Sequence, residues 1–170
     1  MRSPEQTGGL TDDRVYSCIR FDTKTYREHW EPGPWDVEPD EMTWGTSSGH
    51  LGYARRNGCG AWCGYVVIPR GHPDESTKMQ NCITNYKAHG GITWVGSTQL
   101  DSESGKTMLG FDCSQTGDHS PGNLAAGRYQ KMGVYRDLTY VVGEVESLSK
   151  QVALRGGSNA QAKPRVDPLG

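Results

Sequence analysis

The chain has 170 residues, which suits one domain, because domains cluster near ~100–150 residues. Hydrophobic residues make up 34% of it and the mean hydropathy is -0.72, so we expect a modest core with long irregular connections. The formal net charge of -2 argues against a non-specific DNA or RNA binder, which would be clearly basic. No run approaches the ~20 apolar residues of a membrane span, and the N-terminus lacks the apolar stretch of a signal peptide, so we expect a cytoplasmic protein.

The N-terminal part of the chain predicts one strand between two irregular segments. Residues 1–13 are polar and predict a disordered lead. Val15 to Phe21 alternates between apolar and polar side chains, as a half-buried strand does. Residues 31–39 contain three prolines, which remove backbone donors and fix the backbone, so we expect a loop whose neighbouring tryptophans fold against the body.

The middle of the chain predicts four further strands. Residues 51–55 and 61–68 are separated by Asn57-Gly58, a strong signal for a hairpin turn. The second of these runs is the most apolar segment of the protein, and we expect it to form a central strand. Residues 91–95 and 107–111 predict another pair of strands joined by a polar turn.

The C-terminal part predicts the one clear helix. Residues 74–87 are polar and favour no element. Apolar side chains from Leu138 to Val152 recur at spacings of three, four and seven, which places them on one face of a helix. Residues 154–170 contain glycines and prolines and predict a flexible tail. The chain therefore predicts a single α+β domain over residues 14–153, in which a small antiparallel sheet is packed by one long C-terminal helix.

The segment from His72 to His119 concentrates polar groups beside glycines and prolines. It holds three of the five histidines and two of the five cysteines of the chain. Loops at the ends of rigid strands are where binding and catalytic sites are usually built, so we expect the functional site here. The cysteines contain no Cys-x-x-Cys pair, and we expect reduced cysteines that act as small core residues.

Three residues of this segment suit catalysis. His89 is followed by two glycines that would let the backbone approach a ligand closely, and a neutral histidine can act as a general base or acid near pH 7. Asp112 ends the next predicted strand and could orient His89. His72, between a glycine and a proline, is a second candidate acid. Two histidines and an acid would suffice for phosphodiester cleavage without a metal.

Five further residues suit ligand binding. A threonine shares the strand that follows His89, an Asp-His pair lies in a turn that could close the pocket, a tryptophan could stack on a base, and an arginine could help to hold an anion. Each also has a purely structural interpretation, as a turn former, a core aromatic or a solvated charge. The expected ligand-binding residues are Thr93, Trp94, Asp118, His119 and Arg70.

A metal ion bound by His89, Asp112, Asp118 and His119 is the less favoured alternative, and we expect no cofactor. The chain contains no phosphate-binding Gly-x-x-x-x-Gly-Lys-Ser loop, no Gly-x-Gly-x-x-Gly and no Gly-x-Ser-x-Gly. ATPase, dinucleotide oxidoreductase and α/β-hydrolase functions are therefore disfavoured.

Several short motifs follow one another in a fixed order. They are Cys63-Gly64-Tyr65-Val66-Val67-Ile68-Pro69, Gly71-His72-Pro73, His89-Gly90-Gly91-Ile92-Thr93, Gly110-Phe111-Asp112-Cys113 and Gly117-Asp118. This series resembles a group of small, functionally uncharacterised proteins common in bacteriophages and some bacteria, and the resemblance covers roughly residues 30–152. The family pattern carries a histidine two residues after the cysteine of the fourth motif, where this chain has Gln115.

The resemblance and the polar segment together support three hypotheses. In the first, a phage-type counter-defence enzyme in the host cytoplasm cleaves a nucleotide immune signal, such as a cyclic dinucleotide, with His89 and His72 as base and acid. In the second, the same pocket binds and sequesters the signal without cleaving it, as a homo-oligomer. In the third, the segment from Trp30 to Trp44 is the surface of a protein-binding module. The nucleotide ligand follows from the phage context alone.

Overall fold

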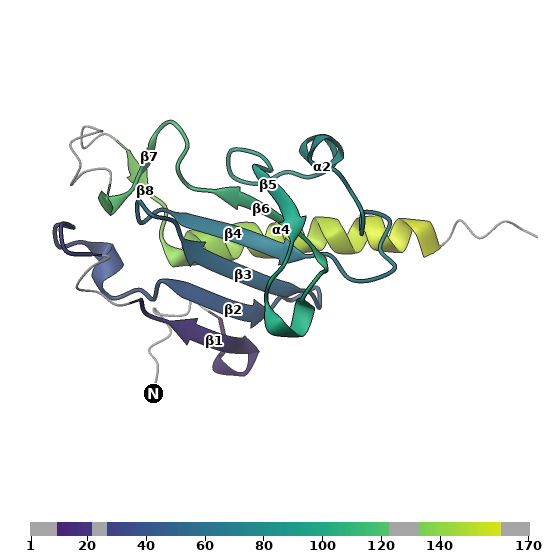
Figure 1. The fold of residues 1–170 in the computed structure, drawn as a ribbon, viewed down its shortest axis with the longest axis horizontal. Helices are drawn as coiled ribbons and strands as arrows, with labels where there is room; N and C mark the ends of the chain where they lie inside the picture. The colour runs from purple at the N-terminus through teal and green to yellow at the C-terminus, as the bar shows by residue number, and fades with distance from the viewer. Residues whose placement is uncertain (1–9, 22–26, 123–132, 161–170) are drawn as a thin grey trace, which may run out of the picture.

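A six-stranded antiparallel sheet packed by one long helix forms the body of the protein (Figure 1). The computed structural model describes residues 10–21, 27–122 and 133–160. The strand order is β1-β2-β3-β4-β6-β5, and the helix α4 lies behind the sheet in the view of Figure 1. We call the other face, turned toward the viewer, the open face. This arrangement confirms the predicted α+β fold with a sheet packed by a C-terminal helix.

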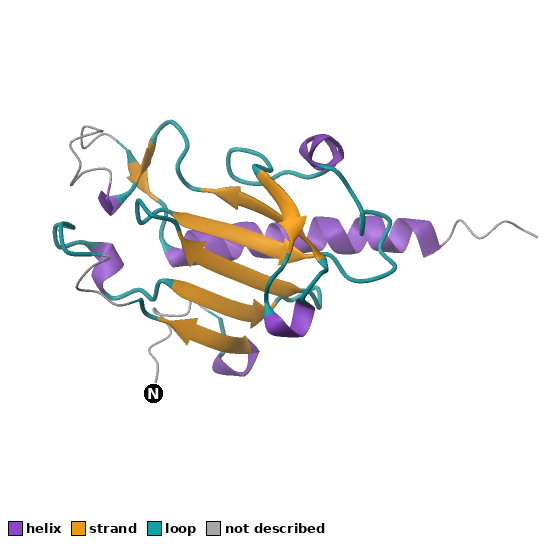
Figure 2. Ribbon diagram, in the orientation of Figure 1, coloured by secondary structure: helices purple, strands orange, loops and turns teal. Residues whose placement is uncertain are grey.

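The regular elements are short apart from α4 (Figure 2). The strands of the main sheet are β1 Val15–Ile19, β2 Glu41–Gly45, β3 Leu51–Arg56, β4 Trp62–Val67, β5 Trp94–Ser97 and β6 Thr107–Asp112. A second, two-stranded sheet pairs β7 Asp118–His119 in parallel with β8 Val134–Tyr135. The helices are α2 Met79–Asn85 and α4 Leu138–Ala160, and the 3-10 turns are η2 Asp12–Arg14, η3 Pro34–Asp36 and η4 Asp101–Glu103.

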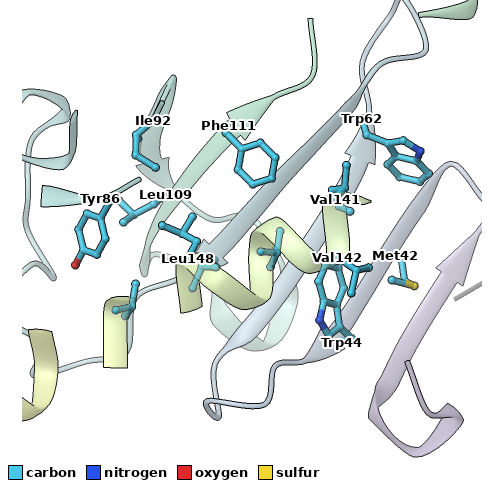
Figure 3. Packing of buried hydrophobic residues seen from close by; sticks show 14 of the residues in the cluster. Met42, Trp44, Trp62, Tyr86, Ile92, Leu109, Phe111, Val141, Val142 and Leu148 are labelled. Atoms are coloured by element: carbon cyan, nitrogen blue, oxygen red, sulfur yellow. The ribbon is translucent and has the colours of Figure 1, made fainter. Parts of the chain in front are cut away.

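The core lies between α4 and the strands (Figure 3). Gly64 of β4 lets the helix approach closely, because a Cβ there would lie 2.8 Å from Cγ2 of Val145 and 2.5 Å from Cζ of Phe111. The predicted helical stripe is confirmed, since all six of its members are buried. They are Leu138, Val141, Val142, Val145, Leu148 and Val152.

The hairpin of β3 and β4 forms as predicted, with Asn57 fixing its turn. The Oδ1 atom of Asn57 accepts hydrogen bonds from the backbone N–H groups of Cys59 (2.9 Å) and Ala61 (3.1 Å). Gly60 has φ +79°, the left-handed conformation that glycine adopts without steric cost. All five cysteines are thiols, and Cys63, Cys82 and Cys113 are buried, as expected for small core residues.

Several boundaries differ from the prediction. The helix α4 continues to Ala160, so the predicted tail begins within it, and residues 161–170 lie outside the described residues. The lead is ordered from Leu10 onward, because Leu10 is buried in the core, and residues 1–9 lie outside the described residues. The predicted strand over residues 91–95 is shifted, since β5 spans Trp94–Ser97, whereas its predicted partner over residues 107–111 matches β6.

The proline-rich segment of residues 31–39 contains only the 3-10 turn η3, and the strand β2, which was not predicted from the sequence, follows it. Trp44 of β2 is fully buried, and Trp35 of η3 is 5% exposed. These two rings belong to the interior, which removes them from the protein-binding surface that the sequence suggested. Residues 74–87, for which the sequence favoured no element, contain α2, which buries Cys82 alone of its residues.

A buried ionic cluster ties the proline-rich segment to the start of α4. One carboxylate oxygen of Glu38 accepts a hydrogen bond from the backbone N–H of Leu138 (2.7 Å), which satisfies a donor at the first turn of the helix. The other oxygen binds Arg56 (2.5 Å) and the hydroxyl of Tyr135. Arg56 lies 4.4 Å above the ring of Trp62 and also contacts Asp40 (3.1 Å), so its charge is compensated although it is buried. The cluster therefore sets where α4 begins.

None of the helices in the described part of the chain is both long and apolar enough to span a membrane.

Candidate functional site

A continuous chain of hydrogen bonds joins three side chains from three parts of the fold. The Nδ1 atom of His89 lies 2.8 Å from the hydroxyl of Tyr140 on α4, and its Nε2 atom lies 2.6 Å from Oδ2 of Asp118 on β7. We call Tyr140, His89 and Asp118 the relay. His89 was predicted as catalytic and Asp118 as ligand-binding, and the structure brings the two into direct contact.

Asp118 is held as a carboxylate at the inner end of the relay. Its side chain is 3% exposed, and Oδ1 accepts a hydrogen bond from Nε of Arg136 (3.1 Å). Oδ2 also accepts the backbone N–H of Gln115 (3.1 Å). The hydrogen bond to Asp118 raises the pKa of Arg136, so the guanidinium stays charged and compensates the buried carboxylate.

These contacts fix the direction of proton donation along the relay. Because Asp118 only accepts, the Nε2–H group of His89 donates to it, and Nδ1 is left as an acceptor for the Tyr140 hydroxyl. Burial, with the nearby charge of Glu144, raises the pKa of Tyr140, so its phenol keeps its proton at neutral pH. A hydroxyl, a histidine acceptor and an orienting carboxylate in this order are the groups of a nucleophilic triad.

The relay opens onto a surface depression of about 560 Å³. His89 and Tyr140 form one side of it, and Lys87 and Glu144 place one positive and one negative charge at its rim. Gln151 binds the Lys87 backbone by two 2.8 Å hydrogen bonds. The N–H of Lys87 donates to Oε1 of Gln151, and Nε2 of Gln151 donates to the carbonyl of Lys87. The remaining lining residues are Ala88 and Ser147. Tyr140 and His89 therefore both line a depression that could hold a small ligand.

The two glycines after His89 form a tight turn. Gly90 and Gly91 have φ +65° and +90°, and Gly91 closes a turn by donating to the carbonyl of Ala88 (2.9 Å). Gln115 packs directly on Gly90, where a Cβ would lie 2.5 Å from Cγ of Gln115. The turn thus presents His89 to the relay and leaves room for Gln115 beneath it.

Asp112 lies one contact away from the relay. Its Oδ1 atom accepts hydrogen bonds from Nε2 of Gln115 (3.0 Å) and the backbone N–H of Ser114 (3.0 Å), and its Oδ2 atom accepts the Thr93 hydroxyl (2.8 Å). Gln115 thus connects Asp112 to Asp118, because its side chain binds the former and its backbone the latter. Asp112 therefore holds the loop and has no hydrogen bond to His89, so the predicted Asp112–His89 contact is absent.

His72, the second predicted catalytic histidine, belongs to a different part of the molecule. It is buried, its Nε2–H donates to the carbonyl of Val152 (2.8 Å), and its Nδ1 accepts the backbone N–H of Asp74 (3.0 Å). Val152 and Tyr140 are twelve residues apart on α4, which is about 18 Å along a helix. His72 is therefore held by backbone groups at a later turn of α4, and no hydrogen bond among the described residues joins it to His89, so their pairing as acid and base stays a prediction.

The other predicted ligand-binding residues also lie away from the relay. His119 follows Asp118 on β7 but packs near Trp35, with ring centres 5.7 Å apart, and burial lowers its pKa. Arg70 is exposed and lies 3.4 Å from Glu75. Trp94 is 38% exposed and lies on the open face of the sheet.

No set of three or more His, Cys, Asp or Glu side chains within residues 10–21, 27–122 and 133–160 is arranged to hold a metal ion. His89 and Asp118 bind each other, and His119 and Asp112 point to other partners. The acidic and histidine residues of the segment therefore work as separate hydrogen-bonded groups.

Tyr140 and Arg136 were not identified from the sequence as members of the site. Tyr140 lies beside the apolar stripe of α4, where the helical pattern draws attention to the buried valines. The signal that could have found it is its position one turn into a helix that starts next to Asp137, whose carboxylate accepts the Tyr140 backbone N–H (2.8 Å). Here Tyr140, near the start of α4, contacts His89, and Arg136, just before α4, contacts Asp118.

In comparisons with known proteins, no family model, no curated protein and no solved structure matches this chain.

Proposed function

We propose that the protein is a metal-independent hydrolase that cleaves a phosphodiester bond in a small nucleotide, with Tyr140 as its nucleophile. The observation that carries the proposal is the relay, in which Nδ1 of His89 lies 2.8 Å from the Tyr140 hydroxyl and Nε2 lies 2.6 Å from Oδ2 of Asp118. The raised pKa of Tyr140 means that the phenol needs such a base before it can attack.

The reaction proceeds in two steps that balance without a further reactant except water. First, the Tyr140 oxygen attacks phosphorus, its proton passes to Nδ1 of His89, and the bond to the leaving oxygen breaks as that proton is delivered to it. Second, water attacks the phosphotyrosine, His89 takes the water proton, and that proton returns to the Tyr140 oxygen. Asp118 stabilises the protonated imidazole in both steps. The guanidinium of Arg136, 4.7 Å from the Tyr140 ring centre, stabilises negative charge on the phenol oxygen as it leaves.

The ligand class rests on the size of the site and on the resemblance to bacteriophage proteins. A depression of about 560 Å³ is in the range of small-molecule sites, which is ~300–1,000 Å³. Lys87 at its rim offers a positive charge to a phosphate. A cyclic dinucleotide immune signal is the specific substrate that the phage context favours, which would make the protein a counter-defence enzyme.

Sequestration of the same ligand is the second candidate function. It is favoured by the completeness of the site without a ligand, because both ring nitrogens of His89 and both carboxylate oxygens of Asp118 have partners within the protein. In this function Tyr140 and Lys87 would bind the nucleotide and no bond would break. A homo-oligomer that assembles several such sites would suit a sponge.

One experiment separates the two functions. The full-length protein is incubated with a panel of cyclic mono- and dinucleotides, denatured by heat, and the supernatant is analysed by chromatography. Hydrolysis predicts linear products from at least one nucleotide, and Tyr140→Phe should lower the rate at least ~100-fold, because it removes the nucleophile and keeps the ring. Tyr16→Phe is the matched control. It changes a 67% exposed tyrosine on β1, away from the relay, and should keep full activity.

Each other outcome decides against the hydrolase. Intact nucleotide that is released only by heat identifies a sponge. Full activity of Tyr140→Phe removes the proposed nucleophile, and a panel that is neither cleaved nor depleted removes the nucleotide as ligand.

A further inference from the structure

The open face of the sheet carries a row of residues that are directly opposite one another across all six strands. Gly64 faces α4, and because side chains alternate along a strand, its neighbour Tyr65 faces the open side. The strand register then defines the whole row. It consists of Ser17, Thr43, Tyr53, Tyr65, Gly110 and Trp94.

The aromatic members of this row meet at defined angles. The rings of Tyr53 and Tyr65 are stacked with centres 5.5 Å apart and planes at 28°. Tyr65 and Trp94 have centres 5.5 Å apart and planes at 87°, so the two rings form a right-angled corner. We call Tyr65 and Trp94 the aromatic corner. A compact ligand placed in such a corner meets the face of one ring and the second ring at once.

Two glycines give the corner its space. A Cβ on Gly110 would lie 2.2 Å from Cδ1 of Tyr65, and a Cβ on Gly96 would lie 2.7 Å from Cζ2 of Trp94. The two rings therefore occupy the space that a side chain at Gly110 or Gly96 would fill. Trp94 is 38% exposed and Tyr65 is half-buried, so part of each residue is exposed to solvent.

A carboxylate without a cationic partner lies next to the corner. Asp112 is two residues from Gly110 on β6, which makes it a diagonal neighbour of both Tyr65 and Trp94, about 7–8 Å away. Within the part of the chain that the structure describes, no lysine, arginine or histidine is within 4.0 Å of its carboxylate. Its hydrogen bonds come from neutral groups. Arg55 and Glu41, which also lie on this face, form an ion pair at 3.3 Å, so each compensates the charge of the other.

From this combination we infer that the open face binds a small alkylammonium compound in the corner of Tyr65 and Trp94, with Asp112 as the counter-charge. Electron-rich ring faces attract cations, and two rings at right angles with a nearby carboxylate suit a compact ammonium group. The uncompensated negative charge disfavours the phosphate of a nucleotide at this position. This site is separate from the relay, which lies at the end of the sheet and on α4.

The test uses the full chain labelled with ¹⁵N and follows the indole N–H signal of Trp94 by NMR during titration. Choline is the probe, and 3,3-dimethylbutan-1-ol, which has the same shape without the charge, is the matched neutral ligand. The site predicts a saturable shift with choline and an affinity roughly tenfold higher than for the alcohol. Asp112→Asn should lower the choline affinity about fivefold and leave the weak binding of the alcohol unchanged.

Two further variants show which residues form the site. Trp94→Ala should abolish the shift of the remaining signals around the corner, whereas Tyr16→Ala, which removes an exposed ring from β1, should bind choline normally. Tyr140→Phe should also bind choline normally, so failure of the nucleotide hydrolase and failure of this site are distinguishable. Thermal melts of each variant identify loss of folding.

Three results would overturn the inference. Equal affinity for choline and the neutral alcohol would leave only a general apolar surface. If adenosine monophosphate binds at Trp94 more tightly than choline does, the row is instead a surface on which a nucleotide base stacks. A lysine-rich peptide that binds at least ~10-fold more tightly than choline would identify a protein partner in its place.

Discussion

Gln115 connects the parts of the candidate site through contacts that a different side chain would not reproduce. It lies on Gly90, binds Asp112 through its side-chain nitrogen and binds Asp118 through its backbone. In this chain the amide of Gln115 supports the loop, and the relay is completed by Tyr140 from the helix.

Gly90→Ala should destabilise the protein by about 2–3 kcal/mol, because the new Cβ both occupies a left-handed conformation and collides with Gln115. Gly91→Ala is the control, since it has φ +90° but no atom within 4 Å of the new Cβ, and should cost about 1 kcal/mol. Urea denaturation of both variants measures the difference. Equal losses would show that Gln115 does not pack on Gly90.

His89 and Asp118 could be predicted from the sequence because each stands next to a glycine in the polar segment between His72 and His119. Their partner Tyr140 could not, since it comes from a helix about 50 residues later and only the packing of α4 brings it to His89. His72 contacts a later turn of the same helix, and no hydrogen bond among the described residues joins it to His89. Both histidines contact α4, but at turns that are about 18 Å apart.

At the level of elements, α4 is the support on which the candidate site depends, and both of its ends are fixed by buried carboxylates. Glu38 binds the backbone at the start of α4, and Asp74 binds Arg155 in the C-terminal part of the helix, five residues before its end. These contacts set the position of the helix along its axis. Tyr140 is therefore placed opposite His89 by interactions outside the site.

Glu38→Gln should lower the free energy of unfolding by about 3 kcal/mol, because it leaves the buried guanidinium of Arg56 without one of its two carboxylates. The matched control is Glu31→Gln, which changes an exposed glutamate of the same segment and should cost less than about 0.5 kcal/mol. Chemical denaturation at neutral pH measures both. A loss as small as that of the control would show that the ionic cluster does not anchor α4.

Asp74→Asn should weaken the protein in a pH-dependent way. The hydrogen bond from Arg155, with that from Tyr86, lowers the pKa of Asp74 below its ordinary value of 3.8. A carboxyl whose folded pKa is lowered contributes stability above pH 3.8, and this contribution is lost as the pH falls through the folded pKa. The variant should therefore lose about 1–2 kcal/mol at pH 7 and converge with the wild type in strong acid. Unfolding curves that stay equally separated at all pH values would contradict this.

At the level of the whole molecule, the sequence predicts those parts whose signals are local. The β3–β4 hairpin follows from its Asn-Gly turn, and α4 follows from its single apolar stripe. The strand β2 alternates between buried and half-buried residues, but its sequence follows three prolines and two tryptophans, which favoured a loop. The helix α2 buries only Cys82 and so has no apolar stripe from which it could be predicted.

The open face could not be predicted from the chain, because it depends on register. Tyr53, Tyr65 and Trp94 come from three strands, and only the pairing of β3, β4, β6 and β5 sets them in one row. A shift of one residue in any pair would move these rings to the other face. The molecule thus has a relay at one end of the sheet and an aromatic row across its exposed side.

The relay is tested most directly by the protonation of His89, measured by long-range ¹H–¹⁵N NMR on the full chain at neutral pH. The structure predicts an imidazole whose Nε2 carries hydrogen and whose Nδ1 accepts the hydrogen bond from Tyr140, and the Nδ1 signal should shift in Tyr140→Phe. The opposite tautomer, with hydrogen on Nδ1, would contradict the account, because His89 could not then take the proton of Tyr140.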